Sequence, residues 1–350
     1  MKSKFSRKAL VALFAVSALV LSACSSGDDA SGDVKVSLIL KNQTNPFFVS
    51  MVKGAEAKAA ELGIDLTIGS GKEEGDDAAQ IAAIENAISA KHAGIVITVM
   101  STNVNSAITK ARDAGLLVIA LDTPTDPADI ADITFATDNR EAGRLIGQWG
   151  AKKLGGQKAI IALLNIFDDR VSPVDYLRDN GFLEGMGIPV NDPNKMADEA
   201  KTGNYSGGAY EIVGNVATGA NEDGGRSGME KLLARNPNIN IVYTINEPTA
   251  IGACAALKAA KKTAIVVSVD GGLPGIEAVK SGCIAATSQQ YPLRMADIGL
   301  QAIYDLVQSG NKPEVTPGKD FFDTGVTLIT DDPQDGVPSE STQYGIDNAW

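Results

Sequence analysis

The sequence predicts an α/β protein built on open, doubly wound parallel sheets, and three observations support this prediction. Short apolar runs of strand length recur along the chain and are rich in β-branched residues, which is typical of parallel strands buried on both faces. Ala-rich amphipathic stretches separate these runs, and several of them end at Gly. The chain has 350 residues, which exceeds one usual hydrophobic core. We therefore expect one or two such sheets and two domains.

The predicted strands and helices alternate from one end of the chain to the other. The expected strands are, in chain order, VKVSLIL, IDLTI, GIVITV, LLVIALD, AIIALLNI, INIVYTI and AIVVSVD. Helices are expected within PFFVSMVKGAEAKAAELG and DDAAQIAAIENAISAKHAG, and Asn45 and Pro46 are the expected N-cap and first residue of the first of them. This βαβα order favours parallel sheets with helices on both faces. A polar stretch at residues 190–210 predicts an insertion in the second half.

The N-terminal residues predict export from the cytoplasm. Four basic residues precede the apolar run ALVALFAVSALVL, which is too short to span a bilayer comfortably, so residues 1–23 are expected to be a signal peptide. The string LSAC resembles a lipobox, which implies a lipid on Cys24; an ordinary cleavage site beside a coincidental Cys is the alternative. Residues 24–32 are polar and Gly/Ser-rich and predict a flexible tether. We expect a globular body attached to a membrane through a lipid anchor only.

Charge and cysteine content exclude some ligands. Without the four basic residues of the signal, the chain has 27 Lys and Arg and 43 Asp and Glu, which gives a formal charge of about −16. This negative charge argues against nucleic acid as a partner. Three Cys and one His give poor support for a metal site, and no cofactor is predicted. An oxidising compartment permits Cys254 and Cys283 to pair, but two separate buried thiols are the favoured expectation.

Enzyme motifs are poorly represented. Any Ser-His-Asp or Cys-His site needs His92, which is expected to be a solvated residue at a helix end. The string GSGK at residues 69–72 fails as a phosphate loop because Leu66 and Glu73 occupy two of the required positions. No Gly fingerprint for a dinucleotide opens the helix after the first strand.

The residues that follow the predicted strands share one chemistry. Ligands of open parallel sheets bind outside the carboxyl ends of the strands. Those ends are followed by carboxylates and carboxamides and by one aromatic pair, at residues 41–48, Asp122, Asn246 with Glu247, Asp270 and Gln290. Asp and Asn at such positions can also cap the next helix. Together they favour hydrogen bonding to neighbouring hydroxyls, with a ring against an apolar C–H face, so we predict a sugar site.

Several strings resemble a known family. TNPFF, ALD, TINEP, SVDGG and ATSQQYP occur in the order and spacing of ribose-type (type I) periplasmic sugar-binding proteins, which deliver sugars to ABC transporters. Two longer strings are most similar to the fructose-binding members: NEDGGRSGMEKLLARNPNINIVYTINEP, which Ala220 precedes, and SVDGGLPGIEAVKSG. The resemblance covers about residues 33–330. It implies two Rossmann-like domains joined by a three-segment hinge, the periplasmic binding protein-like I fold, with a sugar held between them.

The resemblance also implies domain boundaries and site residues. The N-terminal domain would comprise 33–137 plus 291–325, and the C-terminal domain 138–290 plus 326–350, with crossings near ATDN, QQYP and LITDD. The implied sugar contacts are Asn45, Phe47, Phe48, Asp122, Arg178, Asn246, Asp270 and Gln290, with Lys41 and Thr137 as possible further contacts.

The chain departs from the ribose-type pattern at several of these positions. Thr123 stands where those members have Arg, and Lys41 stands where they have a small hydroxyl residue. The Asn that those members carry at about the position of Val99 or Met100 is missing, since neither residue is Asn here. These changes suggest a ligand other than ribose. The family's second stacking aromatic, expected at positions 220–221, is absent, which leaves the far face of the sugar without an assigned partner.

The resulting hypothesis is a monomeric, lipid-anchored, extracytoplasmic solute-binding protein, not an enzyme. It would capture a monosaccharide, with fructose favoured, and deliver it to the permease of an ABC importer. The same fold binding ribose, xylose, an inositol or an autoinducer remains open, as does a module that reports to a sensor. A sugar-processing enzyme could use Asp122 and Asp270 as its carboxylate pair. A transcriptional regulator is disfavoured by the signal peptide and by the absence of a basic helix-turn-helix in the sequence.

Overall fold

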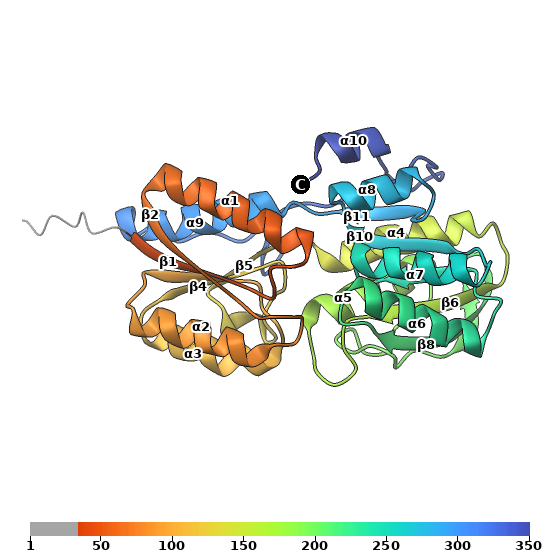
Figure 1. The fold of residues 1–350 in the computed structure, drawn as a ribbon, viewed down its shortest axis with the longest axis horizontal. Helices are drawn as coiled ribbons and strands as arrows, with labels where there is room; N and C mark the ends of the chain where they lie inside the picture. Colours follow the sequence, from red (N-terminus) through yellow and green to blue (C-terminus); the bar gives the residue numbers. More distant parts are fainter. Residues whose placement is uncertain (1–33) are drawn as a thin grey trace, which may run out of the picture. The chain divides into compact units, whose positions relative to one another are not determined.

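A computed structural model describes residues 34–350 of the chain. The predicted signal peptide, the predicted lipidation residue Cys24 and the tether therefore lie outside the described residues. Within residues 34–350, two mainly parallel sheets each have helices packed on their faces (Figure 1). This arrangement confirms the predicted fold class.

The first sheet has the strand order β12-β5-β4-β3-β1-β2, and all its strand pairs are parallel. Its strands are β1 (Val34–Leu40), β2 (Ile64–Ser70), β3 (Gly94–Ile97), β4 (Leu117–Leu121), β5 (Ile133–Ala136) and β12 (Phe322–Asp323). Helices α1 (Pro46–Leu62) and α9 (Pro292–Ser309) cover one face, and α2 (Asp77–Ser89) and α3 (Asn105–Asp113) cover the other (Figure 1). The order 2-1-3-4-5 places a topological switch point, where ligands bind, between β1 and β3.

The second sheet has the order β13-β11-β10-β9-β6-β8-β7. Its strands are β6 (Ala159–Asn165), β7 (Thr202–Tyr205), β8 (Gly208–Ala217), β9 (Ile241–Thr244), β10 (Ile265–Asp270), β11 (Ala286–Gln289) and β13 (Thr327–Ile329). Its helices are α4 (Asn139–Lys153), α5 (Pro173–Met186), α6 (Glu222–Arg235), α7 (Glu247–Ala259), α8 (Leu273–Lys280) and α10 (Thr342–Asp347). The polar stretch at 190–210 leads into β7, which pairs antiparallel with β8. This sheet has its switch point between β6 and β9.

The chain passes between the two sheets three times. It leaves the first sheet between β5 and α4, returns to it between β11 and α9, and leaves it again between β12 and β13. The third passage lies just before the string LITDD, because β13 already pairs with β11 of the second sheet. The division into two domains at these passages stays a prediction.

The first helix begins and ends as the sequence predicts. Asn45 is its N-cap, and the Asn45 side chain accepts a hydrogen bond from the backbone N–H of Phe47 at 3.0 Å. Pro46 occupies the first helical position, where its missing N–H costs nothing. Gly63 ends the helix with φ of 68°, a left-handed conformation that glycine adopts without strain. This local chemistry fixes where the aromatic pair at 47–48 enters the protein.

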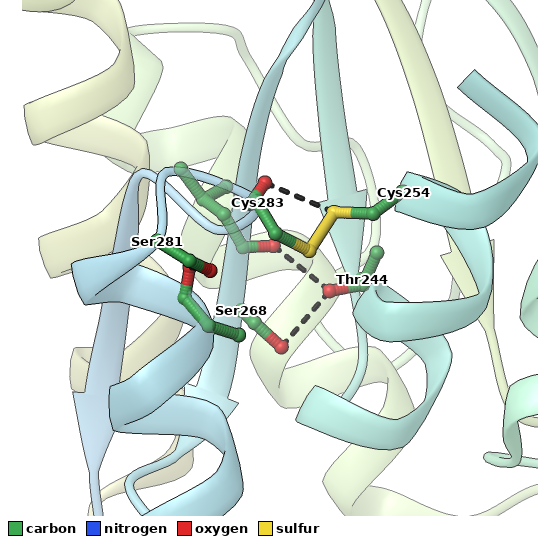
Figure 2. The surroundings of a disulfide bond; sticks show 7 residues. Thr244, Cys254, Ser268, Ser281 and Cys283 are labelled. Carbon is green, nitrogen blue, oxygen red and sulfur yellow. Dashed lines mark hydrogen bonds between the residues drawn. A yellow bond between two sulfur atoms is a disulfide. The ribbon is translucent and has the colours of Figure 1, made fainter. Parts of the chain in front are cut away.

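The expectation of two separate buried thiols is wrong, because Cys254 and Cys283 form a disulfide (Figure 2). Cys254 lies on α7, and Cys283 lies in the turn between α8 and β11. Both residues pack against the same hydrophobic cluster, which brings their Cα atoms to 5.8 Å, within the range that a disulfide needs. The pairing depends on the packing of α7 beside α8, which the spacing of the two cysteines does not reveal.

Residues 34–350 lack both a membrane-spanning helix and a cluster of metal-binding side chains. None of the helices in that range is long and apolar enough to cross a membrane. The same residues contain no group of three or more His, Cys, Asp or Glu side chains that could hold a metal ion.

Candidate functional site

Side chains from the ends of both sheets line one small cavity, called here the inner pocket. Seven of the eight predicted contacts line it, together with Lys41: Asn45, Phe47, Phe48, Asp122, Arg178, Asn246 and Asp270. The remaining walls are Glu74, Ile166, Val174, Ala220 and Ile245. The structure therefore brings together residues from seven segments of the chain that are far apart in the sequence.

Arg178 stands at the centre of the inner pocket, between two carboxylates. Its Nη2 lies 3.5 Å from Oδ1 of Asp122, and its Nη1 lies 3.9 Å from Oδ1 of Asp270. The guanidinium also donates from Nε to Oδ1 of Asn139 at 2.8 Å and from Nη1 to the carbonyl of Ile245 at 2.9 Å. These bonds anchor the guanidinium from α5 and leave only long contacts to the carboxylates. Sugar hydroxyls that donate to the carboxylates and accept from Arg178 could replace those contacts.

Asp122 is held in a strained conformation directly after β4. Its φ is 63°, in the left-handed region that non-glycine residues rarely adopt. The backbone carbonyl of Asp122 accepts a hydrogen bond from Nδ2 of Asn139 at 2.9 Å, and Oδ2 accepts one from the hydroxyl of Thr123 at 2.8 Å. Thr123 thus directs the carboxylate of Asp122.

Asp270 is the second strained carboxylate, at the last position of β10. Its φ is 147°, and its side chain accepts a hydrogen bond from Nε2 of Gln290 at 2.9 Å. Burial raises the pKa of Asp270, an effect that the charge of Asp122 increases and that of Arg178 opposes. Gln290 is fully buried and does not line the inner pocket. Its geometry supports a role in positioning Asp270 rather than direct contact with a ligand.

Glu247 supports Asp270 from behind, a role that the sequence does not reveal. Its carboxylate accepts hydrogen bonds from the backbone N–H groups of Gly271 at 2.8 Å and Gly272 at 3.1 Å, and from the hydroxyl of Thr287 at 2.9 Å. The two glycines follow Asp270 directly, so Glu247 fixes the loop that sets its backbone. Burial raises the pKa of Glu247, and the charge of Asp270 raises it further.

Lys41 contributes a buried cation from the end of β1. Its ammonium lies 3.3 Å from Oε1 of Glu74, and both side chains are almost fully buried. Glu74 also accepts a hydrogen bond from Nδ2 of Asn42 at 3.1 Å. The pair is neutral as a unit, so Lys41 presents a hydrogen-bond donor to the pocket without making it net positive.

The aromatic pair serves both the core and the pocket. Phe47 and Phe48 are 3% and 4% exposed, belong to the core cluster beneath α1 and both line the inner pocket. Their ring centroids lie 5.4 Å apart in an edge-to-face arrangement. Asn45 lines the pocket beside them while its Oδ1 caps α1. Both rings are thus core residues and pocket walls at once.

Two of the implied sugar contacts, Asn246 and Thr137, and the histidine His92 form hydrogen bonds within the protein. Asn246 lines the pocket, but its Oδ1 caps α7 through the N–H of Thr249 at 3.1 Å and its Nδ2 donates to the carbonyl of Ala220 at 3.0 Å. Thr137 lies at the first passage between the sheets and donates to the carbonyl of Gly325 at 3.3 Å, away from the inner pocket. His92 precedes β3, at the opposite end of the sheet from the pocket, and its Nδ1 lies 2.8 Å from the hydroxyl of Ser37.

A larger cavity, called here the outer cavity, lies beside the inner pocket. Its volume is about 410 Å³, against about 30 Å³ for the inner pocket. The two share four lining residues, Asn45, Glu74, Ala220 and Asp270. Trp350 lines only the outer cavity, and its ring packs edge-to-face on Phe47 with centroids 5.4 Å apart. Trp350 gave no signal in the sequence because it follows no strand.

Residues 36–312 match the periplasmic binding protein domain family. The chain belongs to that family. Family membership confirms the resemblance to periplasmic sugar-binding proteins and indicates a location outside the cytoplasm. Its homologues are periplasmic sugar-binding transport proteins, and this periplasmic binding protein is not an enzyme.

Named relatives and solved structures agree with this assignment. The chain is 29% identical over 304 residues to the ribose import binding protein of Haemophilus influenzae, covering 86% of this chain and 95% of that protein. It is 26% identical over 302 residues to the D-allose-binding periplasmic protein of Escherichia coli, covering 84% and 91%. An ABC transporter solute-binding protein of Agrobacterium vitis with bound D-fucose shares the fold with a TM-score of 0.74, at 24% identity over 90% of this chain and 100% of that one.

Proposed function

We propose that this periplasmic binding protein captures a monosaccharide and delivers it to the permease of an ABC importer. One observation carries the proposal: Arg178 stands between the carboxylates of Asp122 and Asp270 in a pocket walled by two phenylalanines. A sugar has hydroxyl groups and apolar C–H faces. Carboxylates accept hydrogen bonds from the hydroxyls, a guanidinium donates hydrogen bonds to them, and aromatic rings pack against the C–H faces. Relatives named for ribose and D-allose binding support a sugar as the ligand class.

Fructose is the favoured monosaccharide. The strings that resemble fructose-binding members support this choice. Thr123 and Lys41, which replace the ribose-type residues, support a ligand other than ribose. Thr123 directs Asp122 through a hydrogen bond, so a changed residue there alters the hydroxyl pattern that the carboxylate can accept. A lipid on Cys24 completes the proposal and would hold the protein near its permease; its support is the lipobox-like string LSAC.

Ligand entry requires motion at the inner pocket. Its volume of about 30 Å³ has room for only one or two water molecules, whereas small-molecule pockets usually measure about 300–1,000 Å³. A monosaccharide can therefore enter only when Arg178 separates from Asp122 and the two sheets part. This requirement supports a hinged clamp.

Calorimetric titration of the mature protein with fructose, ribose, D-allose, xylose, D-fucose and myo-inositol tests the proposal. We expect one-to-one binding, with fructose at least 10-fold tighter than the other compounds. Tighter binding of another monosaccharide would retain the transport role and replace fructose. Absence of binding to every monosaccharide would contradict the proposed function.

A further inference from the structure

The larger part of the open space beside the charged groups lies outside the inner pocket. The outer cavity is lined by the segment before α1 and by the N-terminal ends of α7 and α8. Its volume of about 410 Å³ is sufficient for a small ligand, whereas the inner pocket has about 30 Å³. Since the two cavities share Asn45 and Asp270 in their walls, they adjoin one another, and a ligand held by Asp270 lies directly beside the outer cavity.

Trp350 forms a fixed aromatic wall of the outer cavity. Its indole Nε1 donates to the carbonyl of Gln290 at 3.0 Å, and its ring edge packs on Phe47. A Cβ atom at Gly272 would lie 2.9 Å from the Trp350 ring, so the indole packs against bare backbone there. Trp350 is only half-buried, which leaves part of its ring available to a ligand.

The polar groups of the outer cavity suit a neutral polyhydroxy ligand. Glu73 and Glu222 line the outer cavity and are exposed, and within residues 34–350 their carboxylates form no ion pair or side-chain hydrogen bond. Carboxylates accept hydrogen bonds from hydroxyls and repel phosphate or carboxylate groups on a ligand. An aromatic face combined with such acceptors is the same chemistry that the inner pocket offers.

We propose that the inner pocket and the outer cavity are two adjoining sugar subsites, so that the protein also binds glycosides of its monosaccharide. The inner pocket takes the first ring, and the outer cavity takes a second ring linked to it, stacked on Trp350 and hydrogen-bonded to Glu73 or Glu222. The ligand class is a neutral disaccharide or comparable glycoside. This inference rests on the proposed function, since it needs a first ring in the inner pocket.

Paired titrations test the outer subsite. Each monosaccharide is compared with a disaccharide that contains it: fructose with sucrose, galactose with melibiose and glucose with maltose. For the preferred pair, the disaccharide should bind no more than about 10-fold more weakly than its monosaccharide. Trp350→Ala should reduce the disaccharide-to-monosaccharide affinity ratio by about 3-fold to 10-fold, the loss of one aromatic stacking contact. Trp350→Phe should retain part of the ratio, and Val307→Ala, an exposed change on α9, should retain all of it.

Tryptophan fluorescence gives a second readout that does not depend on affinity. The chain has two tryptophans, and Trp149 is fully buried, so an aqueous quencher such as acrylamide reports mainly on Trp350. The disaccharide should protect against quenching more than the monosaccharide does, and Trp350→Phe should abolish that difference. Melting curves of both variants establish that they are folded.

The possible failures are distinguishable. If a monosaccharide binds but every disaccharide binds at least 100-fold more weakly, the outer subsite is wrong and the proposed function stands. The same conclusion follows if Trp350→Ala leaves the affinity ratio unchanged. If no sugar of either size binds, the proposed function fails and the second subsite fails with it.

Discussion

Among single residues, Asp270 has the most demanding environment in the site. It is 4% exposed, has φ of 147° and faces Arg178 and Gln290 at the end of β10. Backbone strain at a non-glycine residue persists only where surrounding contacts enforce it, and such residues cluster at functional sites. Gln290 and Glu247 supply those contacts, the first to the side chain and the second to the loop that follows.

Asp270→Ala should weaken monosaccharide binding by about 2 to 4 kcal/mol, or roughly 30-fold to 1000-fold. The substitution removes a charged acceptor and leaves a sugar hydroxyl buried without a partner. Calorimetric titration measures the loss, and a melting curve of the same variant shows whether the fold is retained. A lowered melting temperature with an unchanged dissociation constant would remove Asp270 from the site and make it a structural residue only.

Glu247→Gln should change how stability depends on pH. Burial raises the pKa of Glu247 above its unfolded value, so the folded protein binds more protons than the unfolded chain between the two pKa values. The stability contributed by its protonated form is therefore fully present below about pH 4 and is lost as pH rises through the raised pKa. The variant cannot ionise and keeps an acceptor for Gly271.

Melting curves between pH 4 and pH 9 compare the two proteins. The unsubstituted protein should lose stability relative to Glu247→Gln as pH rises. The substitution could also change the pKa of the neighbouring Asp270, which would add its own pH dependence to the difference between the two curves. For that reason Glu247→Gln/Asp270→Asn is compared with Asp270→Asn alone. Parallel curves in both comparisons would show that Glu247 is ionised in the folded protein throughout this range.

Among the elements, α7 and α8 are linked to each other by a hydrogen bond and by the disulfide. Their N-terminal ends meet at Glu247 and Gly272, and the disulfide joins Cys254 on α7 to the turn after α8 (Figure 2). The disulfide lies away from both cavities, since neither cysteine lines them. Its role is therefore expected to be stability rather than recognition.

Cys254→Ser should lower the free energy of unfolding by about 2 to 4 kcal/mol, because the bond closes a loop with a sequence separation of 29 residues. Denaturant unfolding of the oxidised protein and the variant measures the difference, and reduction of the unsubstituted protein is the matched control. Sugar affinity should change less than 2-fold. A stable variant with lost affinity would show that the disulfide acts on the binding site.

The elements were more predictable from the sequence than the contacts between them. Apolar runs in the sequence predict buried parallel strands. The single acidic residue at the end of LLVIALD and of AIVVSVD identifies Asp122 and Asp270 as candidates for the site. Asn246 was harder to interpret, because an Asn after a strand suits both a helix cap and a ligand, and here it caps α7. Glu74, Trp350 and the disulfide depend on how distant segments pack, which no local pattern encodes.

In the whole molecule, polar contacts join residues beside the second sheet to residues beside the first, and we expect these contacts to break when a ligand enters. Nη1 of Arg170, in the loop after β6, donates to the carbonyl of Gly75 at 2.7 Å and pairs with Asp77 at 3.1 Å, which joins the second sheet to the first. Tyr176 donates to Asp126 at 3.3 Å. Such polar contacts break at modest cost, so we expect the two sheets to part by bending at the three chain passages.

Solution scattering should show a smaller radius of gyration with saturating sugar than without it. The reason is that a monosaccharide reaches the inner pocket only when the sheets part, and then bridges them. Arg170→Ala should enlarge the sugar-free radius by removing a contact between the sheets, and Arg226→Ala, a solvent-exposed change on α6, should not. Superimposable curves with and without sugar would reject the hinged clamp.

Titration of the preferred monosaccharide into Arg178→Ala tests whether the sugar binds between Asp122 and Asp270. Arg226→Ala serves as the charge-matched control, because it removes an exposed arginine far from the inner pocket. We expect one-to-one binding to the unsubstituted protein and to Arg226→Ala, and a loss of at least 30-fold in affinity for folded Arg178→Ala. Equal affinity in all three proteins would contradict binding of the sugar between Asp122 and Asp270.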